Sequence, residues 1–207
     1  MRRAFLVSCI RGITGATARW VEPYSVRQCI YFANHTSHLD AIVLWASLPH
    51  DLRERTRPAA ARDYWEATRL RRYLAERVFH AILIDRTKVT VQNNPIRKMT
   101  EAMGDDYSLI IFPEGRRNPG DKVEEFKSGL FHLAKEKPHA ALVPVYIDNL
   151  NRILPKGEFL PVPLLSSITF GRPLPVIPNE SKAEFLERAR KAVCDLNPNA
   201  EHHEAVH

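Results

Sequence analysis

Short apolar runs and amphipathic stretches alternate along this chain, and the alternation predicts its secondary structure. Runs rich in β-branched and aromatic residues predict strands over 26–33, 81–84, 108–112, 141–147 and 167–170. Stretches with helical periodicity predict helices over 39–48, 63–79, 94–103, 126–136 and 182–196. Strands that alternate with helices are typical of α/β proteins. We therefore expect a single α/β domain whose mostly parallel or mixed central sheet is flanked by helices.

Two segments stand apart from this pattern. The Pro-rich stretch 155–163 predicts a loop, after which the last strand can join the sheet differently. Residues 1–22 predict an amphipathic helix, followed by the main domain over 23–207. An apolar face of this helix can lie in a lipid interface or pack on its own domain, and both interpretations stay open. No stretch approaches the ~20 apolar residues that span a bilayer.

Charge is distributed unevenly along the chain. The 207 residues carry a net charge of +6, but residues 1–98 hold 17 Lys and Arg against 8 Asp and Glu. A basic half indicates an acidic partner, such as a phosphate-bearing substrate, an anionic bilayer or a nucleic acid. An ordinary solvated, Arg-rich surface is the alternative. We expect no nucleic-acid partner, because no recognised nucleic-acid motif is present.

The three cysteines are far apart and form no Cys-x-x-Cys pair. This spacing argues against a zinc knuckle or a disulfide framework. A reducing cytosol is the compartment that fits it best.

The chemistry-bearing residues follow predicted strands, where ligands gather in α/β sheets. His35 and Asp40 can meet if the histidine lies in the loop and the aspartate in the first helical turn. Ser37 as N-cap would place Asp40 at the third helical position. The carboxylate would then orient the ring and leave its other nitrogen as a general base, with His38 as the rival base. Alternatively, Asp40 caps the helix and His35 is an ordinary loop residue.

Two further strand ends carry charge. Asp85-Arg86 follows the strand 81–84, and the strand 108–112 runs into Pro113-Glu114-Gly115-Arg116-Arg117. Arginine guanidinium groups match phosphate oxygens, so these residues suit a phosphate-bearing ligand. The glycine permits a tight turn, and Glu114 can position an arginine or accept from a substrate hydroxyl. Structural ion pairs are the alternative for each of these charges.

Together these motifs resemble those of the glycerolipid acyltransferases, the PlsC-like lysophosphatidate acyltransferase group. The segment 34–40 matches the family's Asn-His-x-Ser-x-x-Asp motif, and Asp85-Arg86 matches its second motif. The segment 112–117 is similar to Phe-Pro-Glu-Gly-Thr-Arg, with Arg116 in place of threonine. The apolar segment 142–145, with its proline, is similar to the fourth motif. The chain lacks the long hydrophobic N-terminal segments of many relatives, which puts integral membrane anchoring in doubt.

The resemblance implies a fold like that of glycerol-3-phosphate acyltransferase and a direct acyl transfer. His35 would be the base and Asp40 its orienting carboxylate, while Arg86, Glu114, Gly115 and Arg117 would hold the acceptor. It implies no metal and no cofactor beyond acyl-CoA or acyl carrier protein as co-substrate. The acceptor would be a lysophospholipid, with lysophosphatidate favoured, at an anionic membrane surface. We expect a cytoplasmic protein, peripheral at the inner face of the membrane. A lipid-binding protein with little turnover is the alternative function.

Overall fold

The central sheet confirms the predicted α/β class. The computed structural model describes residues 2–25, 27–85, 93–118, 120, 122–148 and 166–198, with side chains from Leu6 onward. Within these ranges one seven-stranded sheet has the order β1-β7-β6-β2-β5-β3-β4. Neighbouring strands run parallel except β6 and β7, which are antiparallel, so the sheet is mixed. The strands are β1 (Thr17–Trp20), β2 (Cys29–Ala33), β3 (Thr56–Ala61), β4 (Ile82–Ile84), β5 (Ser108–Ile111), β6 (Ala141–Asp148) and β7 (Ser167–Phe170).

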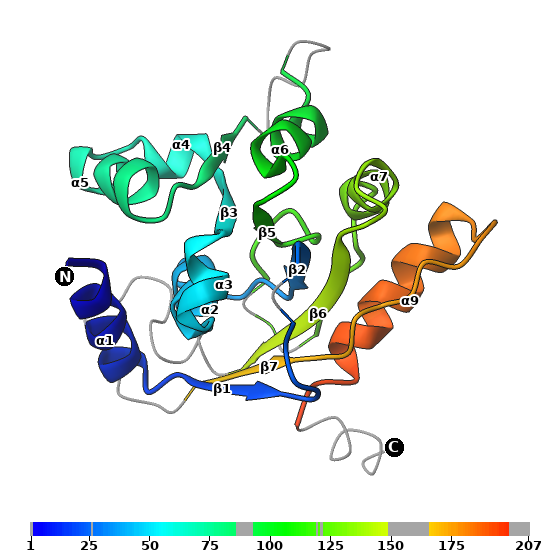
Figure 1. Ribbon diagram of the computed structural model, residues 1–207, viewed down its shortest axis with the longest axis horizontal. Coiled ribbons are helices and arrows are strands. Elements are labelled where there is room, and N and C mark those ends of the chain that lie inside the picture. Colours follow the sequence, from blue (N-terminus) through cyan, green and yellow to red (C-terminus); the bar gives the residue numbers. More distant parts are fainter. Residues whose placement is uncertain are drawn as a thin grey trace.

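Helices cover both faces of this sheet (Figure 1). One face carries the N-terminal helices, which are α1 (Arg2–Thr14), α2 (Asp40–Ser47), α3 (His50–Glu54), α4 (Arg62–Trp65), α5 (Arg69–Tyr73) and a π-helical turn, η1 (Leu74–Val78). The other face carries α6 (Pro95–Met103), α7 (Gly129–Glu136) and α9 (Lys182–Cys194). The result is a three-layer arrangement of helices, sheet and helices.

Strand β2 lies at the centre of both hydrophobic cores. All five of its residues are buried, which is why it reads as a continuous apolar run in the sequence. Because side chains alternate across a strand, Tyr31 and Ala33 enter the core under α1 and α2. Ile30 and Phe32 enter the core under α6, α7 and α9. The strand end from which the next loop leaves is therefore held by hydrophobic packing on both faces of the sheet.

Capping residues define the ends of two helices. Asn94 caps α6 by accepting the Ile96 N–H at 2.9 Å, and Pro95 occupies the first helical position. The Ser181–Glu184 pair forms a capping box at the start of α9. These local signals explain why the positions of both helices were predictable.

The predicted helix over 63–79 is wrong as a single element. Thr68 has an extended backbone (φ −136°, ψ 152°) that separates α4 from α5. Its hydroxyl accepts the Arg71 N–H at 3.2 Å and so caps a new helix. Threonine competes in this way with helix continuation, because its side chain offers the backbone a local partner. The chain then widens into the π-helical turn η1 before β4.

Strands β1 and β3 and helix α3 are elements that the sequence pattern missed. Strand β3 contains Arg57 and Pro58 followed by three alanines, so it lacks the β-branched and aromatic signature. It forms because its backbone pairs with β5 on one side and with β4 on the other. Long-range pairing thus overrides local propensity here.

The N-terminal segment is shorter as a helix than the sequence predicts. Helix α1 ends at Thr14, and β1 within the same range pairs in parallel with β7. Val7 is buried, and Leu6 and Ile10 pack against the same core. The Arg11 guanidinium donates to the Ala46 carbonyl at 3.0 Å, which joins α1 to α2. No helix in the described ranges is long and apolar enough to cross a membrane.

The packing of α1 predicts that substitutions at two of its positions change the free energy of unfolding by different amounts. Val7→Ala should lower the free energy of unfolding by about 1–3 kcal/mol, because it leaves a cavity beneath α1. Ile13→Ala should change it by less than about 0.5 kcal/mol, because Ile13 is 53% exposed. Urea unfolding followed by circular dichroism measures both. Equal effects of the two variants would contradict the packing of α1.

Candidate active site

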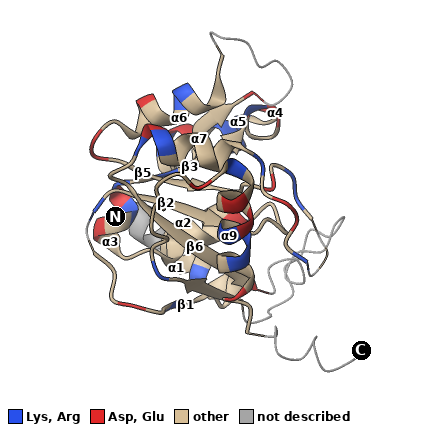
Figure 2. Cartoon of the chain, turned by 90° about the vertical axis from the view of Figure 1, so that its right-hand side faces the viewer, with Lys and Arg blue, Asp and Glu red and all other residues tan. Residues whose placement is uncertain are grey.

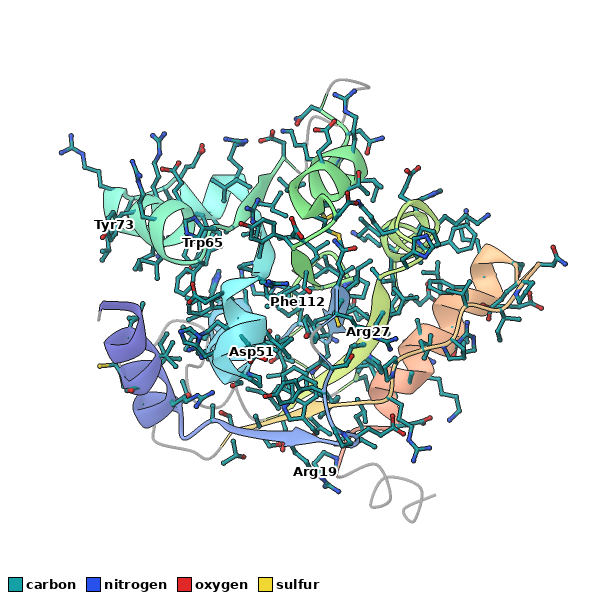
Figure 3. All side chains as sticks on the ribbon, in the orientation of Figure 1. Arg19, Arg27, Asp51, Trp65, Tyr73 and Phe112 are labelled. Carbon is teal, nitrogen blue, oxygen red and sulfur yellow. The ribbon has the colours of Figure 1, made fainter. Side chains whose placement is uncertain are left out.

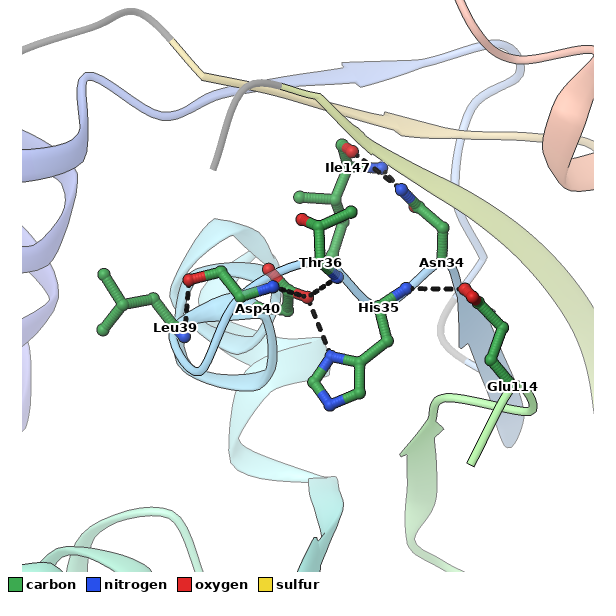
Figure 4. A network of polar contacts seen from close by, with 8 residues as sticks. Asn34, His35, Thr36, Leu39, Asp40, Glu114 and Ile147 are labelled. Atoms are coloured by element: carbon green, nitrogen blue, oxygen red, sulfur yellow. Dashed lines mark hydrogen bonds and ion pairs between the residues drawn. The ribbon is translucent and has the colours of Figure 1, made fainter. Parts of the chain in front are cut away.

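The His35–Asp40 pair is formed as the sequence predicts. The Nδ1 atom of His35 lies 2.8 Å from Oδ2 of Asp40 (Figure 4). The same oxygen accepts the backbone N–H groups of Thr36 at 2.7 Å and Ser37 at 2.9 Å. The Asp40 side chain is 0% exposed and that of His35 is 12% exposed. A buried carboxylate with three donors is held in one orientation, and it holds the ring in turn.

The start of α2 differs from the prediction. The helix begins at Asp40 itself, and Ser37 does not cap it, since the Ser37 hydroxyl accepts only the Leu39 N–H at 3.3 Å. Asp40 instead turns its carboxylate back onto the preceding loop. The physical reason is that its oxygen finds three donors there, including the imidazole. His35 and Asp40 meet, but through a different local geometry from the predicted one.

Asn34 attaches the loop that carries His35 to the sheet. Its side-chain amide donates to the Ile147 carbonyl at 2.9 Å and accepts the Ile147 N–H at 2.8 Å (Figure 4). The side chain thereby continues the β2–β6 ladder beyond the last residue of β2. A side chain that donates and accepts at once is needed for this, and asparagine supplies both groups.

The backbone of His35 is clamped by the loop that follows β5. Its N–H donates to Oε1 of Glu114 at 2.8 Å, and its carbonyl accepts the Asn118 N–H at 2.7 Å. The other carboxylate oxygen of Glu114 accepts the Glu124 N–H at 3.3 Å. Glu114 is 2% exposed. Its carboxylate thus contacts the backbone of the loop that carries His35, rather than an arginine of the described residues.

Burial changes the ionisation of Glu114. It raises the pKa of the carboxyl to about 7, against the opposing effect of the two backbone donors. The carboxyl group is therefore protonated more readily than that of an ordinary glutamate. Its hydrogen bond to the loop that carries His35 consequently depends on pH.

Gly115 allows the turn that brings Glu114 inward. Its φ is +71°, a conformation that favours glycine. A Cβ atom here would also lie 2.9 Å from Cδ and Nζ of Lys127. The Lys127 side chain thus lies directly against the turn, with its backbone N–H donating to the Pro113 carbonyl at 2.9 Å.

Two cations stand beside the histidine. Arg117 and Lys127 are exposed and line the same cavity as His35. Neither has a carboxylate partner among the residues that the structure describes. Arg116 differs, because its guanidinium pairs with Glu124 at 2.8 Å. Lys127 was missed by motif reasoning, because it is ten residues beyond Arg117 and only folding brings the two together.

The described residues include only the first half of the second motif. Asp85 accepts from Arg62 of α4 at 3.0 Å, from Asn93 at 2.8 Å, and pairs with Lys98 of α6 at 3.5 Å. It therefore ties α4 and α6 to the end of β4. Arg86, predicted to bind the acceptor, lies outside the described residues.

His38 is held apart from the Asp40 carboxylate. Its ring stacks on Tyr64 with centroids 4.2 Å apart. Burial, followed by the nearby Arg117, lowers its pKa to about 4. His38 lines the cavity as a neutral ring, and the oriented histidine of the two is His35.

The cavity beside His35 has a volume of about 650 Å³, within the usual range for small-molecule sites. Its inner wall is apolar and comes from both β-strands and helices, including Ala59, Ile96, Met99, Ile111, Leu130 and Leu133. His35, Arg117 and Lys127 form a polar part of the same wall. Such a site suits a ligand with a long apolar chain and an anionic head.

The fold and the His35–Asp40 pair define an α/β protein that can take a proton from a ligand beside a large, mostly apolar cavity. Residues 21–148 match the Acyltransferase family. Because this match covers well over half of the 207 residues, the chain belongs to the acyltransferase family.

Named relatives agree with this assignment. The 1-acyl-sn-glycerol-3-phosphate acyltransferases of Limnanthes alba and Limnanthes douglasii are each 29% identical over 148 residues, 68% of this chain and 49% of each relative. The protein of that name from Chlamydomonas reinhardtii is 25% identical over 118 residues, 56% of this chain and 35% of the relative. The chain therefore spans about half the length of the first two relatives, and less of the third.

The fold also matches a solved structure. The crystal structure of the 1-acyl-sn-glycerophosphate acyltransferase PlsC from Thermotoga maritima superposes with a TM-score of 0.70. The match covers 98% of this chain and 81% of that one, at 20% sequence identity. This likeness shows that the two proteins share a fold.

The raised pKa of Glu114 predicts a pH-dependent contribution to stability. The folded state prefers the protonated form, so the contribution is complete below the ordinary pKa of 4.5 and is lost as pH rises through about 7. Glu114→Gln removes the titration, and its other effects do not change with pH. The stability of wild type relative to the variant should fall by about 1–3 kcal/mol between pH 5 and pH 8. Urea unfolding at both pH values measures this change. A constant difference would contradict the burial argument.

Proposed function

We propose that this protein transfers a fatty acyl group from a thioester carrier to a hydroxyl of a phosphate-bearing lysolipid. The carrier is acyl-CoA or acyl carrier protein, and lysophosphatidate is the favoured acceptor. The observation that carries the proposal is that His35, oriented by Asp40, shares one cavity with an apolar wall and with two cations that have no carboxylate partner in the described part of the chain. The names of the relatives support the same reaction.

The hydrogen bonds of Asp40 decide which nitrogen of His35 acts as the base. A carboxylate can only accept, so Nδ1 carries the proton that lies between the ring and Oδ2. The Nε2 atom is then unprotonated, and it has no hydrogen-bond partner among the described residues. Nε2 is the atom that takes the proton from the acceptor hydroxyl.

The reaction balances without any further group. As the O–H bond of the acceptor breaks, its oxygen attacks the thioester carbonyl and forms a tetrahedral intermediate. The carbon–sulfur bond then breaks, and the thiolate takes the proton from Nε2. Asp40 stabilises the imidazolium while it exists, because the charged ring lies beside a buried carboxylate. The products are the acylated lipid and the free thiol.

The charged part and the apolar part of the cavity wall would bind different parts of the substrates. Arg117 and Lys127 supply positive charge for the phosphate of the acceptor. The apolar wall from β3, β5, α6 and α7 removes acyl methylene groups from water. Glu114 and Asn34 fix the loop that carries the base. We place this work at the cytoplasmic surface of an anionic membrane, where such lipids reside.

The proposal predicts a large loss of turnover when the base is removed. Acyl transfer to a panel of lysophospholipids and glycerol-3-phosphate, from acyl-CoA and from acyl carrier protein, should fall at least ~100-fold in His35→Ala. Asp40→Asn should also fall by more than tenfold, because the amide can stabilise the wrong tautomer. His38→Gln should retain most activity, because His38 is not oriented by Asp40.

Each other outcome has a definite meaning. Activity unchanged in His35→Ala but lost in His38→Gln would transfer the role of base to His38. No transfer by wild type with either carrier would sink the proposal, and a lipid-binding protein would replace it.

Lys127 should contribute to binding of the acceptor rather than to the rate of the chemical step. Lys127→Met removes one of the two cations and should raise KM for lysophosphatidate about tenfold or more, with kcat changed by less than ~3-fold. KM for a monoacylglycerol, which has no phosphate, should stay the same. Lys135→Met is the matched control, since Lys135 lies on α7 against Phe131 and away from the cavity. An equal loss with both acceptors would contradict a phosphate contact.

A further inference from the structure

Helix α5 is unusually exposed for a helix in the middle of a domain. It has the sequence Arg-Leu-Arg-Arg-Tyr, and none of its five residues is buried. Leu70 is 69% exposed and Tyr73 is 50% exposed. Figure 3 places Tyr73 at the outer rim of the molecule, whereas Trp65 of α4 lies on the inner side. The fold therefore leaves two large apolar side chains uncovered here.

Two of the three arginines of α5 also have no carboxylate partner among the described residues. Arg72 pairs with Glu76 at 2.9 Å, but Arg69 and Arg71 have no carboxylate partner in the described part of the chain. Three of the four cations of α9 differ. Arg188, Arg190 and Lys191 each lie within 2.7 Å of an acidic oxygen. Figure 2 shows the resulting mixture of blue and red along α9. Arg69 and Arg71 of α5 thus differ from the arginines of α9, which are paired with carboxylates.

A continuous stack joins α5 to the active site. The Arg71 guanidinium lies 4.4 Å from the centre of the Tyr64 ring, and that ring stacks on His38 at 4.2 Å. Tyr64 and His38 both line the cavity that contains His35. A partner bound to α5 would therefore lie next to the part of the cavity wall that Tyr64 and His38 form.

We propose that α5 is the surface by which the protein docks on an anionic bilayer. Leu70 and Tyr73 would enter the interface between lipid headgroups and acyl chains, where a leucine and an amphipathic tyrosine ring are both favourable. Arg69 and Arg71 would face anionic headgroups, which supply the missing negative charge. The proposal rests on the proposed function, because a lysolipid acceptor reaches the site from a membrane.

The chemistry of the surface favours a bilayer over other polyanions. Its two exposed apolar side chains are interleaved with arginines, whereas a phosphate backbone alone would need only the charge. Docking through α5 places the cavity beside the lipid. The acceptor then moves into the site without a passage of its acyl chain through water.

The test is sedimentation with vesicles made of equal parts phosphatidylglycerol and phosphatidylcholine, at low salt and without acyl donor. Wild type should bind these vesicles and bind pure phosphatidylcholine much less. The variant Leu70→Ser/Tyr73→Ser/Arg69→Gln should partition at least about tenfold more weakly. The control Val176→Ser/Ile177→Ser removes two side chains of similar exposure, 59% and 46%, and should bind as wild type does.

A turnover assay separates this proposal from the proposed function. The triple variant should acylate a short-chain, water-soluble acceptor at the wild-type rate and lose activity only on an acceptor presented in anionic vesicles. If wild type shows no turnover at all, the proposed reaction fails, but the vesicle experiment still decides the role of α5. The docking proposal is overturned if the triple variant binds vesicles like wild type or if wild type ignores anionic vesicles. It is also overturned if gel filtration shows that the triple variant only changes the oligomeric state.

Discussion

The buried carboxylate of Asp40 is the interaction on which the site depends. Its side chain has no exposed surface, and a buried polar group is stable only when hydrogen-bond partners replace the lost water. Three donors meet its Oδ2 atom, namely the His35 ring and the N–H groups of Thr36 and Ser37, whereas its Oδ1 atom has no hydrogen-bond partner among the described residues. The same contacts also fix the direction of the His35 ring. The packing of this loop and the geometry of the His35–Asp40 pair are thus consequences of one arrangement.

The rest of the fold holds that arrangement in place from two sides. Asn34 extends the sheet towards Ile147, and Glu114 with Asn118 clamps the backbone of His35 from the loop after β5. Both attachments come from strands that neighbour β2, so the parallel order of the sheet decides which loops can reach the histidine. Gly115 completes this frame, because its left-handed turn also lets Lys127 approach the cavity.

The segment between β3 and β4 folds differently from what its local sequence pattern predicts. Read locally, residues 63–79 look like one amphipathic helix with an arginine-rich face. In the structure Thr68 breaks it, α4 contributes Tyr64 and Trp65 to the cavity, and α5 is left outside the core. One continuous helix would place the residues of α4 and α5 along a single axis. As two short helices, α4 can line the cavity while α5 faces a partner.

The sequence by itself determined the class of fold, most of the strands and the helices near 39–48, 94–103, 126–136 and 182–196, because these depend on local periodicity. It also determined the capping box of α9, whose two partners are three residues apart. It offered the His35–Asp40 pair as one of two interpretations of residues five apart, and the resemblance to a family favoured it. Tertiary structure alone decided that β3 is a strand, that Glu114 holds the catalytic loop, and that Lys127 joins Arg117 at the cavity. It also decided that α5 stays uncovered. Each of these depends on contacts between segments far apart in the chain, which no local pattern of hydrophobic and polar residues records.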